Sequence, residues 1–174
     1  GDEDEPMDPL RQRAVPHAVA IARLRAGYDT VLRARGRSMA PYLVPGQRVR
    51  LEPVAAERLR IGELVAFEQR GRVVLHRVLS VHRPTGTVRE MGDGNRWSSR
   101  ISARSVLGRA VAILTPRRIL LDRGLHRALG PWVAGMSRLH EALHRGRERL
   151  PGRGGPLVRR LLWRARAWRA RLIR

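Results

Sequence analysis

The sequence has no cysteine and no lysine, and each absence removes a class of chemistry. Without cysteine, the 174-residue chain can form no disulfide, thiol nucleophile or thiolate metal site. All 36 basic residues are arginine, so a Ser–Lys catalytic dyad is excluded as well. Aromatic residues make up only 4% of the chain, which leaves Val, Leu, Ile and Ala to build the core. A hydrophobic content of 43% excludes a wholly disordered protein, and the length favours one domain.

Long hydrophobic runs are also absent. Nowhere do 18 consecutive apolar residues occur, so we expect no membrane-spanning helix. Residues 15–24 come closest to a signal peptide, but His17 and Arg23 interrupt them. These observations predict a cytoplasmic protein, with peripheral contact to a membrane as a further option. The scattered histidines predict no metal site and no cofactor.

Charge is distributed unevenly along the chain, whose net charge is +21. Residues 1–8 hold only acids among their charged side chains, whereas the remainder is rich in arginine, most densely after residue 116. Together with the pattern of hydrophobic residues, this divides the chain into four parts. They are an acidic tail (1–8), a helical lead-in (9–28), a β domain (29–116) and a basic helical extension (117–174).

The central part has the alternation of β-strands. Val49 and Leu51 alternate with charged residues, and two apolar segments, 64–68 and 72–81, flank a short loop with glycine at its end. A second turn at 84–86 leads into residues 87–91, and residues 105–114 resemble a closing strand. After Pro116 the pattern becomes helical over 119–129, 132–145 and 157–174. We therefore predict a mainly β domain followed by helices.

Two histidines, His76 and His82, lie in the predicted β domain. Because no lysine exists, a serine nucleophile in this chain would need a histidine as its base. His82 lies beside a turn, where a solvated residue is the simpler interpretation. His76 lies in the middle of the strand 72–81 and, by alternation, projects from the face opposite Leu75. That position suits the wall of a cleft.

Five ordered sequence blocks resemble the signal peptidase I superfamily, in its Ser–His branch. That branch includes archaeal, sporulation-associated and endoplasmic-reticulum signal peptidases and is related in fold to LexA-type self-cleaving repressors. The blocks cover roughly residues 30–115 and begin with Gly-Arg-Ser-Met-Ala-Pro and Gly-Gln-Arg-Val. The others are Gly-Glu-Leu-Val-Ala-Phe, Leu-His-Arg-Val and Gly-Asp-Gly-Asn, at residues 36–41, 46–49, 62–67, 75–78 and 92–95.

The resemblance implies a role for several residues. Ser38 matches the nucleophile and His76 matches the residue that replaces the lysine of bacterial enzymes, with backbone N–H groups near Ser38 stabilising the oxyanion. Asp93 matches an acid that has been assigned the role of orienting the histidine, whereas Ser99 stands where the branch commonly has a second Asp. An alternative interpretation of Asp93 is a turn-forming residue. The residues implied to bind substrate are Gly36, Met39 and Pro41.

The C-terminal segment 157–174 combines apolar residues at helical spacing with arginines and two tryptophans. Such a cationic amphipathic helix suits an anionic membrane surface. Packing against the protein's own domain or a partner is the alternative, and nucleic-acid binding is less well supported because no base-reading motif is visible.

The sequence thus predicts a serine endopeptidase that cleaves a precursor or leader peptide through an acyl-Ser38 intermediate, with His76 as general base. The substrate would bind as an extended strand, with small side chains before the cut as the resemblance implies. The alternative is a catalytically weak or inactive binding module of the same fold, which docks at an anionic membrane surface or on a partner protein.

Overall fold

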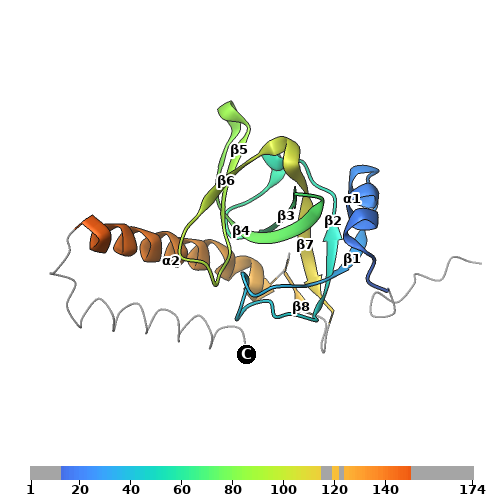
Figure 1. The fold of residues 1–174 in the computed structure, drawn as a ribbon, viewed down its shortest axis with the longest axis horizontal. Coiled ribbons are helices and arrows are strands. Elements are labelled where there is room, and N and C mark those ends of the chain that lie inside the picture. Colours follow the sequence, from blue (N-terminus) through green and yellow to red (C-terminus); the bar gives the residue numbers. More distant parts are fainter. Residues whose placement is uncertain (1–12, 115–118, 122–123, 150–174) are drawn as a thin grey trace, which may run out of the picture.

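A strongly curled antiparallel sheet forms the body of the protein, as the ribbon in Figure 1 shows. The computed structural model describes residues 13–114, 119–121 and 124–149. Neighbouring strands follow the order β1-β2-β7-β3-β4-β5-β6, and β8 pairs with β7. The strands are β1 (Thr30–Arg33), β2 (Arg48–Glu52), β3 (Leu64–Gln69), β4 (Arg72–His82), β5 (Thr87–Met91), β6 (Ser99–Ser102), β7 (Val106–Ile113) and β8 (Ile119–Leu120).

Two α-helices lie at the two ends of the described chain. Helix α1 (His17–Arg25) packs on β1, β4 and β7, and helix α2 (Gly124–Arg149) packs on β4. In Figure 1 they occupy opposite sides of the sheet. The expectation of a mainly β domain followed by a helix is therefore confirmed. Within the described residues, no helix is long and apolar enough to span a membrane.

The β3–β4 hairpin forms as its sequence predicts. Gln69 pairs with Arg72 across a two-residue loop in which Arg70 (φ 51°) and Gly71 (φ 70°) both adopt left-handed conformations. This is the backbone geometry of a tight hairpin loop, because its twist matches that of the strands. The hairpin places alternate side chains in two separate apolar clusters. One cluster includes Leu64, Ala66, Val73 and Leu75, and the other includes Val65, Phe67 and Val78.

The C-terminal helix differs from the sequence expectation in two ways. Residues 119–120 form strand β8 and not the start of a helix, and α2 continues through Pro131, where a break was expected. A proline inside a helix costs about 3 kcal/mol, so packing has to offset it. Val133 and Ala134 are buried, and the Gly130 backbone lies against Gly62 so closely that a Cβ on Gly62 would approach it to 2.0 Å. These packing contacts offset the cost of the proline, so α2 stays continuous.

Candidate active site

Ser38 lies in the turn region between β1 and β2 and is half-buried. Gly36, two residues before it, has a φ of 77°, which favours glycine. The Ser38 carbonyl oxygen accepts a hydrogen bond from the Gly94 N–H at 2.7 Å. A Cβ on Gly92 would lie 2.5 Å from that same oxygen, so the 92–95 loop approaches Ser38 only because glycine stands there. The two loops therefore position Ser38 together.

A buried ion pair holds the 92–95 loop in place. Both carboxylate oxygens of Asp93 accept from the Arg77 guanidinium, at 2.9 and 2.6 Å, and Arg77 also donates to the Gly62 carbonyl at 2.8 Å. Burial opposes the charge of Arg77, but Asp93 outweighs burial and raises the pKa of the guanidinium. The Asp93 N–H contacts the Met39 sulfur at 3.4 Å. Asp93 thus supports the loops around Ser38.

Glu90 supplies the carboxylate that contacts His76. Glu90 Oε2 lies 2.5 Å from His76 Nδ1, and Glu90 Oε1 accepts from Ser99 Oγ at 2.7 Å. Only 2% of Glu90 is exposed. Asp93, which the sequence suggested for this position, contacts Arg77 and makes no hydrogen bond to His76 among the described residues. The expected contact between Asp93 and His76 is therefore not present: Asp93 pairs with Arg77, and Glu90 contacts His76.

Strand register explains how Glu90 reaches His76. Glu90 pairs with Val78 on β4 and with Ser99 on β6, so its side chain shares a face with His76, two residues from Val78. The His76 ring also meets the edge of Phe67 at a centroid distance of 5.7 Å. A carboxylate at Nδ1 accepts the proton of that nitrogen and leaves the Nε2 lone pair free. The imidazole is therefore held as a base.

Ser38 and His76 are not joined by a hydrogen bond. Within the described part of the chain, Ser38 makes one hydrogen bond, through its carbonyl oxygen, and none through its hydroxyl or its N–H. A free N–H beside the hydroxyl is the kind of donor that an oxyanion requires. The structure therefore contains a hydroxyl, a free amide and an imidazole in contact with Glu90. Ser38 lines the groove described below, whereas His76 is not among its lining residues.

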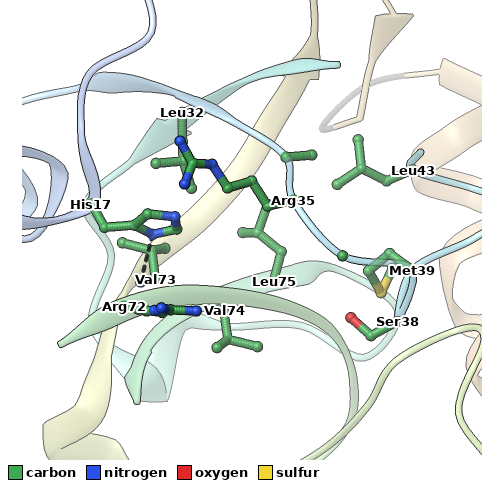
Figure 2. A pocket seen from close by; sticks show the side chains of 12 residues that line it. His17, Leu32, Arg35, Ser38, Met39, Leu43, Arg72, Val73, Val74 and Leu75 are labelled. Carbon is green, nitrogen blue, oxygen red and sulfur yellow. Dashed lines mark hydrogen bonds between the residues drawn. The ribbon is translucent and has the colours of Figure 1, made fainter. Parts of the chain in front are cut away.

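A groove of about 310 Å³ begins at Ser38 and extends toward α1, as the close-up in Figure 2 shows. Gly36 and Met39, two of the residues implied to bind substrate, line it, and the buried Met39 contributes to its floor. Pro41 is exposed and lies outside the lining set. The lining residues are His17, Leu32, Ala34, Arg35, Gly36, Ser38, Met39, Leu43, Arg72, Val73, Val74 and Leu75.

One wall of the groove is an unpaired strand edge. Strand β5 pairs with β4 only from Arg77 onward, so within the described residues β3 is the one strand that pairs with residues 72–76. Because Gln69 and Arg72 close the hairpin, the backbone groups of Val73 and Leu75 point away from β3 and toward the groove. This edge offers N–H and C=O groups to an extended peptide.

His17 already accepts a hydrogen bond from one of these edge N–H groups. Its Nδ1 accepts from the Val73 N–H at 3.0 Å, although the two residues are 56 positions apart in sequence. Burial lowers the pKa of His17, and the charges of Arg35 and Arg72 lower it further. A neutral imidazole is what an acceptor nitrogen requires. In the described residues, no cluster of three or more potential metal ligands accompanies this or any other histidine.

Comparisons with known proteins found no match: neither a family model, nor a curated protein, nor a solved structure. The resemblance to signal peptidases therefore stays a prediction. Two site residues were missed from the sequence, Glu90 and His17. The sequence did contain a signal for Glu90. Val88 and Glu90 are two residues apart in a predicted strand and so share one face, and an acid on an apolar face needs a partner. His17 carried no such signal. Residues 1–8 and 157–174 lie outside the described residues.

Proposed function

We propose that this protein is a serine endopeptidase in which Ser38 is the nucleophile, His76 the general base and Glu90 the residue that orients the base. The observation that carries the proposal is the buried Glu90 carboxylate on His76 Nδ1, at 2.5 Å. A buried acid that fixes the tautomer of an imidazole is the arrangement that serine hydrolases use. His76 lies on β4, whose residues 72–75 line the Ser38 groove, and this position supports the same proposal.

The reaction would follow the usual course of acyl transfer. His76 Nε2 takes the Ser38 hydroxyl proton as Oγ bonds to the substrate carbonyl carbon. The oxyanion is stabilised by N–H donors, of which the free Ser38 amide is the candidate. The imidazolium then gives its proton to the departing amine as the peptide bond breaks, and water releases the acyl group by the same steps. The substrate would lie along the open edge of β4.

A library of extended peptides tests the proposal. We expect cleavage by the wild-type protein, and the Ser38→Ala variant should lose at least about 1,000-fold in rate because the covalent step is removed. Mass spectrometry of the products identifies the cleaved bonds. Binding of the intact peptides to the Ser38→Ala variant shows whether its groove is still formed. Cleavage that persists in this variant would contradict the proposal.

The second candidate function is a peptide-binding module of the same fold without efficient catalysis. One observation favours it: among the described residues, the contacts of the His76 ring are with Glu90 and Phe67, and none is a hydrogen bond to Ser38. This module would bind the same library peptides in the groove but release them intact. Ser38-dependent product formation decides between the two. A cytoplasmic location, with contact of residues 157–174 to an anionic membrane surface, is proposed for either case.

A further inference from the structure

The far end of the groove is positively charged. Its lining residues include Arg35 and Arg72 and no acid. Both arginines are exposed, and among the described residues neither forms a hydrogen bond or ion pair. Several other arginines of the sheet are neutralised, such as Arg50 by Asp29 and Arg109 by Glu52. The two groove arginines thus differ from these paired ones in having their charge available to a ligand.

The positive charge of Arg35 and Arg72 lies beside the β4 edge, along which a bound peptide would extend. Arg35 and Arg72 both disfavour protonation of His17, so their field reaches the imidazole that accepts from the Val73 N–H. A peptide that adds to the β4 edge at Leu75 and continues past Val73 would run beside this imidazole. Figure 2 shows His17, Arg35 and Arg72 around the end of the groove opposite Ser38. An acidic side chain on such a peptide would meet both guanidinium groups.

We propose that the groove selects peptides that carry an Asp or Glu side chain two to four residues from the scissile bond. This specificity rests on the proposed function, because the two to four residues are counted from a scissile bond at Ser38. The spacing follows from the strand: Leu75 and Val73 are two residues apart, about 6.6 Å along a strand, and the arginine side chains extend beyond Val73. The ligand class is therefore an extended acidic peptide.

The experiment measures binding to the Ser38→Ala protein, so that no cleavage is needed. The probes are fluorescent 11-residue peptides of Ala, Val and Ser, with a single Asp or the isosteric Asn moved through each position. We expect the best Asp peptide to bind about threefold to tenfold more tightly than its Asn partner, as one or two exposed ion pairs provide. The preference should shrink as salt rises from 50 to about 500 mM.

Two variants and one control test whether Arg35 and Arg72 cause the preference for Asp. Arg35→Gln with Arg72→Gln should bring the affinities for the Asp peptide and its Asn partner to the same value. Arg35→Glu with Arg72→Glu should reverse it, so that the Asn peptide binds more tightly than its Asp partner. Arg104→Gln removes an exposed arginine outside the lining set and should leave the preference intact. Equal binding of Asp and Asn peptides, or the same loss in Arg104→Gln, would overturn the inference.

A parallel cleavage assay separates this inference from the proposed function. If the wild-type protein cleaves none of the peptides while the Ser38→Ala variant still prefers Asp, the peptidase proposal fails and the acidic selectivity stands as a property of a binding groove. If cleavage occurs with equal rates for Asp and Asn peptides, the peptidase stands and the selectivity is wrong.

Discussion

Glu90 and Asp93 are three residues apart and both buried, yet they bind different partners. Glu90 contacts an imidazole that can gain and lose a proton. Asp93 contacts the guanidinium of Arg77, which keeps its charge at every ordinary pH. Removing the first carboxylate should therefore affect catalysis, whereas removing the second should affect stability. Paired substitutions of the two acids distinguish these roles.

Glu90→Gln tests the catalytic assignment. The amide is nearly isosteric but no longer stabilises the imidazolium that forms during attack. We expect kcat to fall about 100-fold or more with little change in KM, and the urea midpoint to shift only slightly. Steady-state kinetics and urea unfolding on the same preparations measure the two effects. Unchanged kcat would remove Glu90 from the mechanism.

Asp93→Asn is the matched comparison. It leaves the Arg77 charge buried without its counter-ion, and breaking such a pair costs about 3–5 kcal/mol. The free energy of unfolding, measured with urea, should fall by that amount. While the protein remains folded, its kcat should fall far less than that of Glu90→Gln. A stable Asp93→Asn protein whose kcat falls as far as that of Glu90→Gln would restore Asp93 as the orienting acid.

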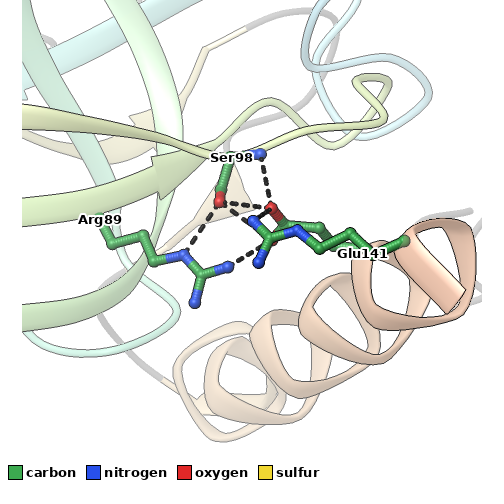
Figure 3. A network of polar contacts seen from close by, with 4 residues as sticks. Arg89, Ser98 and Glu141 are labelled. Carbon is green, nitrogen blue, oxygen red and sulfur yellow. Dashed lines mark hydrogen bonds and ion pairs between the residues drawn. The ribbon is translucent and has the colours of Figure 1, made fainter. Parts of the chain in front are cut away.

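Among the elements, α2 also contacts the sheet through the carboxylate of Glu141. Glu141 accepts from Ser98 Oγ at 2.8 and 2.9 Å and from Arg89 at 2.5 Å, so the helix is tied to the β5–β6 hairpin, as Figure 3 shows. Burial acts to raise the pKa of Glu141, but Ser98, Arg89 and Arg145 outweigh it, and the net pKa lies below the ordinary 4.5. The ionised form is thus the stabilising one.

Glu141→Gln should therefore destabilise the protein in a pH-dependent way. A depressed carboxyl pKa contributes stability that is present above about pH 4.5 and is lost as pH falls through the lower folded value. We expect a loss of about 1–3 kcal/mol at pH 7, from hydrogen bonds to a charged group, and a smaller one near pH 3.5. Urea unfolding at both pH values measures it. An equal loss at the two values would rule out the ionic contribution.

Elements with a strong period were predictable from the sequence, and those that depend on partners were not. Alternation located β2, β3, β4, β5 and β7 to within one or two residues. Strands β1, β6 and β8 have two to four residues and owe their conformation to pairing with neighbours. Glu90 was missed for a similar reason: its partner His76 lies on the adjacent strand, and only the register between β4 and β5 brings the two together.

On the scale of the whole molecule, the charge of +21 favours anionic surfaces. The densest cluster of arginines belongs to residues 157–174, and each arginine near an acidic lipid surface contributes about 1 kcal/mol. We expect the full chain to co-sediment with phosphatidylglycerol vesicles but not with phosphatidylcholine vesicles. A chain ending at residue 156 should bind markedly less. If the full chain and the shortened chain bind equally, the arginines before residue 157 cause the attraction to the vesicles.

The open edge of β4 has a second consequence, which concerns solubility. An unpaired strand with free N–H and C=O groups is a template on which another copy of the same chain could add a strand. Two copies joined edge to edge there would bring Arg35 and Arg72 of one molecule against the same pair of the other. Their repulsion opposes that contact, and His17 covers one of the donors in advance. The charges that would attract an acidic peptide also protect the protein from self-association.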